Sequence, residues 1–240
     1  MNNLLALTIQ AHGGLENWEK IKNVSARLEV GGLTWIKKQQ PELLTDVLVS
    51  VATKRQFVSY NVQGNEGWHT SFEANHVTAQ TNKGEIIEEL FSPRESFEGH
   101  TRETPWTQLQ AFYFASYAIW TYLNAPFNFA DPGYEVKEIE PWEESNQLWR
   151  RLQVRFPKTI ATHNPVQTFY IDQEGLIRRH DYNVEIIGNA TSSHYLDDYI
   201  EVQGFKIATK RRVYLRKEDN TPLTPEPLLV SINLSEIKFQ

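Results

Sequence analysis

TPWTQLQAFYFASYAIWTYL, residues 104–123, is the stretch that decides the fold of this chain. Thr104 is a favourable N-cap, Pro105 suits the first position of a helix, and Pro126 predicts where the helix ends. Aromatic and aliphatic residues cover nearly the whole circumference, as is typical of a helix that is buried on most sides. Roughly 19 residues at 1.5 Å each make a rod of about 28 Å, the width of a small domain.

The same stretch is too polar for a transmembrane helix. A membrane span needs ~20 predominantly apolar residues. Ser116 and Thr121 lie inside this run, and Gln108 and Gln110 stand near its start. We therefore predict a helix that crosses the interior of a globular domain.

On both sides of the predicted helix, apolar residues recur with a period of two, which is typical of half-buried strands. The clearest cases are residues 24–30, 47–51, 152–156 and 230–234. We expect nine to eleven strands, preceded by two short helical pieces. The predicted fold class is mainly β (α+β): a curved antiparallel sheet, or half-barrel, wrapped around the central aromatic helix.

The composition favours one globular domain over residues 1–240. No linker, repeat or low-complexity tract interrupts the chain. The net charge of −6 argues against non-specific nucleic-acid binding, which needs a basic surface. The chain contains no cysteine, which excludes disulfides, thiol nucleophiles and thiolate metal sites.

The N-terminal residues predict a short helix rather than a secretion signal. Asn2 or Asn3 can cap a helix that runs to about His12. The segment has no basic region, and its apolar run is short. We therefore expect a cytoplasmic protein.

The layout resembles the half-barrel of bacterial lipoprotein carriers, the LolA/LolB-like superfamily. The matching features are the N-terminal helix with Gly13-Gly14, the hairpin of residues 169–178 and the hairpin of residues 199–207. This resemblance implies a curved antiparallel sheet around helices, with an apolar cavity between them.

The chain also resembles a group of uncharacterised bacterial proteins. The shared stretches are Gly99-His100 with Thr104-Pro105-Trp106, the run Arg178–Tyr182 (RRHDY) and the run Arg211–Tyr214 (RRVY). This second resemblance covers nearly the whole chain and implies no activity.

The aromatic helix is the first candidate for a functional surface. Large aromatic side chains can form the wall of an apolar pocket, although at helical spacing they also build ordinary cores. We predict binding of an apolar or lipid-like small molecule in a cavity of a few hundred Å³ between sheet and helix. The candidate ligand-binding residues are Trp106, Leu109, Phe112, Tyr113, Tyr117, Trp120 and His180.

An enzyme of the isomerase or hydrolase type is an alternative, with His180 and Asp181 or Asp198 as an acid–base pair. Alternation turns His180 toward the interior and Asp181 to the other face, and it places Asp198 on the same side of its strand as His194. His180, His194 and a nearby carboxylate could also form a metal site, but no His-x-His or HExxH spacing supports it. We expect no metal and, because no nucleotide-binding motif is present, no cofactor.

A third possibility is an interaction module that has a solid core and binds no ligand. It predicts a flat apolar patch on the surface. The sequence indicates no particular protein partner, and it leaves these three functions open.

Overall fold

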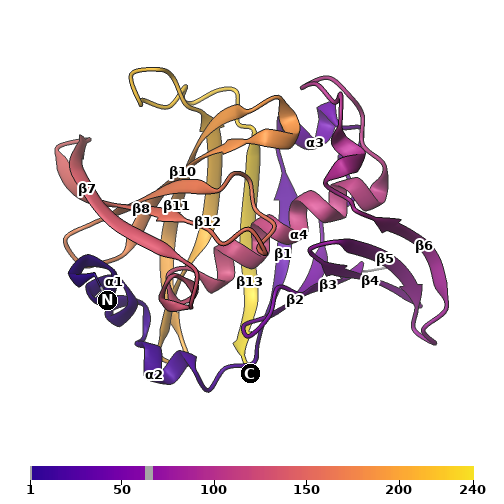
Figure 1. The fold of residues 1–240 in the computed structure, drawn as a ribbon, viewed down its shortest axis with the longest axis horizontal. Helices are drawn as coiled ribbons and strands as arrows, with labels where there is room; N and C mark the ends of the chain where they lie inside the picture. Colours follow the sequence, from indigo (N-terminus) through magenta and orange to yellow (C-terminus); the bar gives the residue numbers. More distant parts are fainter. Residues whose placement is uncertain (1, 63–66) are drawn as a thin grey trace.

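The chain folds into one open, curved antiparallel sheet with its longest helix lying across one face (Figure 1). The structure is a computed structural model that describes residues 2–62 and 67–240. The helices are α1 (Asn3–His12), α2 (Leu15–Trp18), α3 (Leu33–Lys37) and α4 (Gln108–Asn124), with 3-10 turns η1 (Glu95–Phe97), η2 (Phe127–Ala130) and η3 (Glu185–Ile187). The strands are β1 (Asn23–Gly31), β2 (Val47–Ala52), β3 (Val58–Val62), β4 (Trp68–Glu73), β5 (His76–Thr81), β6 (Ile86–Phe91), β7 (Glu135–Glu144), β8 (Gln147–Arg155), β9 (Val166–Ile171), β10 (Ile177–Val184), β11 (Ala190–Val202), β12 (Phe205–Leu215) and β13 (Val230–Phe239).

The sheet has 13 strands in the order β6-β5-β4-β3-β2-β1-β13-β12-β11-β10-β9-β8-β7. Strands that follow one another in the chain are neighbours within β1–β6 and within β7–β13, and the pairing of β1 with β13 joins these two halves. Strands β6 and β7 are the two edges, and α4 lies between them in the chain. The helix therefore carries the chain from one edge to the other, across the face that we call concave (Figure 1).

The structure confirms the predicted mainly-β class with a central helix, but two elements were not predicted. Strand β7 is an edge strand that pairs only with β8, and charged residues interrupt its alternation. Charges are common on edge strands because they discourage pairing with other chains. The short helix α3 follows Gly32, whose φ of 111° favours glycine.

The start of α4 differs from the prediction. The N-cap is Thr107, not Thr104: the Thr107 hydroxyl accepts from the Gln110 backbone N–H, and the Gln110 side chain accepts from the Thr107 N–H. This is a capping box, which satisfies two backbone donors at once. Thr104 instead accepts a hydrogen bond from the backbone of Thr101, and the Trp106 N–H donates to the carbonyl of Lys38.

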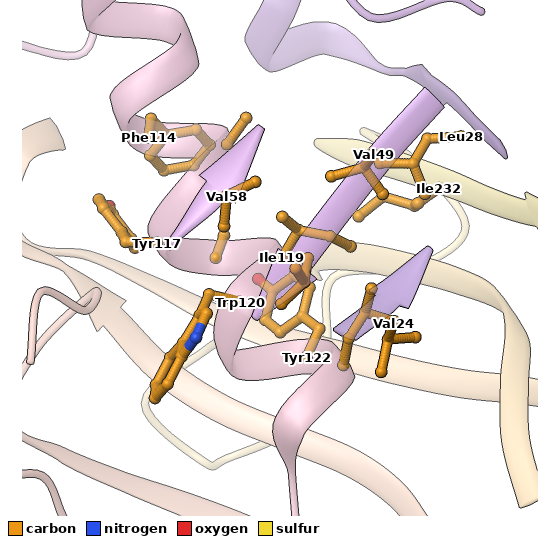
Figure 2. Close-up of a cluster of buried hydrophobic side chains, with 14 of the residues drawn as sticks. Val24, Leu28, Val49, Val58, Phe114, Tyr117, Ile119, Trp120, Tyr122 and Ile232 are labelled. Carbon is orange, nitrogen blue, oxygen red and sulfur yellow. The ribbon is translucent and has the colours of Figure 1, made fainter. Parts of the chain in front are cut away.

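The predicted burial of α4 is confirmed, since every residue from Leu109 to Asn124 is buried. Phe112 packs against Tyr60 and Trp68, with ring centroids 5.5 and 6.3 Å away. Full burial of each such side chain stabilises the fold by about 1.5–3 kcal/mol. Figure 2 shows the helix side chains facing those of the strands. Its labelled residues are Phe114, Tyr117, Ile119, Trp120 and Tyr122 of α4 and Val24, Leu28, Val49, Val58 and Ile232 of the sheet.

The N-terminal helix α1 packs against strands β8 and β12 of the same sheet. The Asn2 side chain accepts from the N–H groups of Leu4 and Leu5, which confirms the predicted cap. At Gly13, with φ of 129°, a Cβ would lie 2.7 Å from the carbonyl oxygen of Gly204 in the β11–β12 turn. A side chain here would push α1 away from this hairpin. None of the described helices is long and apolar enough to cross a bilayer.

Candidate functional site

An apolar cavity of about 160 Å³ lies between α3, the first half of α4 and the concave face of β10–β13. We call it the α3 cavity. Lys37, Lys38 and Arg102 stand at its polar side. The remaining lining residues are Leu33, Thr34, Phe114, Tyr182, Val184, Ile187, Ala190, Ser192, Val213, Leu215, Pro227, Leu229 and Val230. The cavity is smaller than the predicted few hundred Å³, because aromatic side chains of α4 fill most of the interior.

Two further cavities of about 30 Å³ each continue from the α3 cavity along the helix. The middle cavity shares Phe114, Tyr182, Val213 and Val230 with the α3 cavity. The next one, which we call the α1 cavity, reaches His12 and shares Tyr122 with the middle cavity. Each small cavity has room for one or two water molecules. The three spaces thus form a row, separated by side chains rather than by backbone.

Polar side chains lie along this row, inside the concave face. We call His163, His180, His194, Tyr122 and Tyr182 the histidine cluster. The Tyr122 hydroxyl lies 2.9 Å from both the His163 Nε2 and the Tyr182 hydroxyl. His180 Nε2 lies 2.6 Å from Gln167 Oε1, an acceptor, so this ring nitrogen donates. Neither ring nitrogen of His194 has a hydrogen-bond partner among the described residues.

Burial keeps the histidines of this cluster uncharged. It lowers the pKa of His163 from 6.5 to about 3, and the Arg94 charge adds to this effect. Burial also holds the pKa of His180 and of His194 well below 6.5, with smaller contributions from neighbouring positive groups. At neutral pH these rings are neutral hydrogen-bonding groups.

Arg211 of β12 is a buried charged residue beside the histidine cluster. Its side chain is 3% exposed, and its Nη2 donates to the Tyr122 carbonyl at 3.1 Å. No Asp or Glu of the described residues forms an ion pair with it, and its Nε has no hydrogen-bond partner among them. Burial lowers the pKa of the Arg211 guanidinium.

The predicted ligand-binding residues are buried, but they do not line the α3 cavity. Trp106, Leu109, Phe112 and Trp120 are core residues, and the Trp120 indole N–H donates to the Ala52 and Arg55 carbonyls.

Three other predicted binding residues lie elsewhere along the interior. Tyr113 borders an open cleft beside residues 156–165. The Tyr117 hydroxyl is buried and has no partner among the described residues. His180 lines the α1 cavity, so the expectation that it faces inward is confirmed.

The sequence did not identify the residues that line both the α3 cavity and the middle cavity, namely Phe114, Tyr182, Val213 and Val230. Tyr182 and Val213 belong to the RRHDY and RRVY stretches. Their alternation places them on the inward face, but it does not show which inward residues border empty space.

The structure does not bring the predicted acid–base pair together. Asp181 follows His180 on β10 and therefore faces the opposite, convex side, where it accepts hydrogen bonds from Arg179 and Tyr170. Asp198 is exposed and pairs with Lys210 at 2.7 Å.

Asp198 was expected to share the inward side of His194. Its φ of 52° changes the alternation of β11, so that Leu196 and Tyr199, three residues apart, both line the α1 cavity. Within residues 2–62 and 67–240, no three His, Asp or Glu side chains gather as a metal site would require.

The opposite face of the sheet holds a complete ionic network around Arg179. Its guanidinium donates to both Asp181 oxygens at 2.7 Å and to Glu144 at 2.6 Å. Burial would lower the pKa of Arg179, but the bonds and charge of Asp181 outweigh burial and raise it. Tyr195 donates to the same Glu144 carboxylate. This network attaches β7 and the loop of residues 217–222 to the sheet, because Arg179 also donates to the Asn220 carbonyl.

Three solved structures share this fold, and each matches the chain over nearly its full length at low sequence identity. A DUF1329 family protein from Desulfovibrio piger matches with a TM-score of 0.55 and 8% identity, covering 99% of this chain and 92% of that one. A LolA superfamily protein from Nitrosomonas europaea matches with the same TM-score, identity and coverage.

A putative outer membrane lipoprotein-sorting protein domain from Vibrio parahaemolyticus matches with a TM-score of 0.54 and 10% identity, covering 99% and 91% of the two chains. No family model and no curated protein matches the sequence. The shared property is therefore the fold, which confirms the resemblance seen in the sequence.

Proposed function

We propose that this protein binds an apolar, lipid-like small molecule in the α3 cavity, between the curved sheet and α4. The observation that carries the proposal is the cavity itself. It is about 160 Å³, and apolar side chains from four strands, two helices and one loop form most of its wall. Small-molecule sites are concave and mostly apolar, with a few polar groups that orient the ligand.

A cavity of this size accepts a small apolar group, because cavities of about 150 Å³ bind benzene. A longer chain needs the two smaller cavities as well. Phe114 and Tyr182 separate the α3 cavity from the middle cavity, and Tyr122 separates the middle cavity from the α1 cavity. A longer ligand therefore requires these side chains to adopt other rotamers, including the hydrogen-bonded pair Tyr122 and Tyr182.

Binding of N-phenyl-1-naphthylamine, an uncharged fluorescent probe, tests the proposal. Ala190 lines the α3 cavity, so Ala190→Leu places a larger side chain inside it. We expect the variant to bind the probe at least about tenfold more weakly than the unmodified chain. Ala6→Leu makes the same change on the exposed side of α1 and should leave binding unchanged.

Absence of probe binding by the unmodified chain would reject the proposal, as would equal binding by Ala190→Leu. Native mass spectrometry of freshly purified protein provides a second test, in which a retained small molecule is expected. The cytoplasmic location stays a prediction that cell fractionation can check.

A further inference from the structure

The guanidinium of Arg211 is a buried charge without an anionic partner among the described residues. Burying an unpaired charge is costly, and proteins normally compensate it with a counter-ion. Arg211 has one hydrogen bond, to the Tyr122 carbonyl in the last turn of α4. The partial negative charge of a helix C-terminus is about half an elementary charge, so it compensates the arginine only in part.

Hydrogen-bond donors without an acceptor among the described residues, and the α1 cavity, lie next to the Arg211 charge. Arg211 borders the α1 cavity, and its buried Nε–H has no acceptor among the described residues. His194 of the neighbouring strand β11 is fully buried with two free ring nitrogens. Both side chains contact Tyr122: the His194 ring lies 4.5 Å and the Arg211 guanidinium 5.4 Å from the Tyr122 ring.

We propose that Arg211 binds the acidic head group, a carboxylate or a phosphate, of an amphipathic ligand whose apolar part extends past Tyr122 toward the α3 cavity. The inference rests on the function proposed above and adds the charge and the orientation of the ligand. An acid oxygen in the α1 cavity accepts the free Arg211 Nε–H. Charge-assisted bonds of this kind are roughly twice as strong as neutral ones.

The sizes of the cavities agree with this orientation. The α1 cavity has about 30 Å³, enough for the few atoms of a head group, and carries Arg211, His180 and His12 on its wall. The α3 cavity is about five times larger and mostly apolar. A ligand with its acid end at Arg211 therefore places its apolar part in apolar space.

Displacement of N-phenyl-1-naphthylamine from the full chain tests the inference with three competitors of equal chain length: decanoate, decyl phosphate and decanol. We expect at least one of the acids to displace the probe at a concentration about tenfold or more below that of decanol. Arg211→Met should reduce this preference to within about twofold, while Arg211→Lys keeps part of it. Arg212→Met is the matched control, since Arg212 is the next residue of β12 and bonds to Asn233 and the Ile232 carbonyl instead.

The outcomes separate this inference from the proposed function. If decanol displaces the probe as well as both acids do, the ligand site stands and the role of Arg211 is rejected. The same holds if Arg211→Met keeps the preference for acids. If the probe does not bind at all, both proposals fail. Displacement by only one acid supports the inference and identifies the head group.

Discussion

Two arginines of the same sheet are both buried, but only one of them has carboxylate partners. Arg179 on the convex face, 0% exposed, has two carboxylates within hydrogen-bond distance, and tyrosines complete the network. Arg211 on the concave face, 3% exposed, has one backbone carbonyl and a neighbouring cavity. A charge that is fully paired inside the fold stabilises structure, whereas one that is left unpaired beside a cavity is available to a ligand.

The largest difference between the two faces should appear on acidification. Four buried histidines, His12, His163, His180 and His194, lie on the concave side, and burial lowers the pKa of each, to about 4 for His12 and about 3 for His163. Below pH 6.5 the unfolded chain binds protons that the folded chain does not. The free energy of unfolding therefore decreases as the pH is lowered from 6.5 toward the pKa values of the folded state. At pH 5 the loss is about 2 kcal/mol for each histidine.

Urea unfolding at pH 7.5 and pH 5 measures this loss. His194→Phe keeps an aromatic ring of similar shape and should recover about 2 kcal/mol of the loss at pH 5. A free energy of unfolding that is the same at both pH values would contradict the neutral, buried state of the cluster.

The second largest effect is expected on the convex face. Arg179→Met removes the cation, which leaves Glu144 without its ion-pair partner and Asp181 with the more distant Arg216, 3.6 Å away. Breaking a buried ion pair in this way costs about 3–5 kcal/mol. Arg150→Met is the control, because the pair of Arg150 with Glu138 is largely exposed and contributes at most about 1 kcal/mol. A loss no larger for Arg179→Met than for Arg150→Met would refute the assignment of a structural network.

The smallest effect, and the only one of opposite sign, is expected for Arg211→Met. The substitution removes an uncompensated buried charge and one hydrogen bond to a carbonyl. We expect the ligand-free protein to become more stable by about 1 kcal/mol, because a well-packed apolar side chain avoids the desolvation cost. A free energy of unfolding that falls by more than about 2 kcal/mol in urea would contradict this prediction. It would show that the main role of Arg211 is to cap the C-terminus of α4.

Local signals in the sequence predicted much of the fold and less of the site. The two-residue period located most of the strands, and the all-round apolarity of residues 109–123 identified the buried helix. Strand β7 was missed because charged residues and Pro141 interrupt the alternation of its apolar residues. The helix start was misplaced because Thr104 and Thr107 both suit an N-cap, and the contact of Trp106 with Lys38 helps to hold residues 104–106 outside the helix.

The sequence by itself determined which side chains of a regular strand face inward, because alternation along a strand is a local property. It placed His180 correctly, but it misplaced Asp198, where the positive φ breaks the alternation. Only the tertiary structure decided which inward-facing side chains meet. Tyr122 contacts His163, Tyr182 and Arg211, which lie 41 to 89 residues further along the chain. Such contacts depend on strand register and on the path of α4 between the two edges of the sheet. The cavities depend on the same two features, because they lie where aromatic side chains do not fill the space between α4 and the curved sheet.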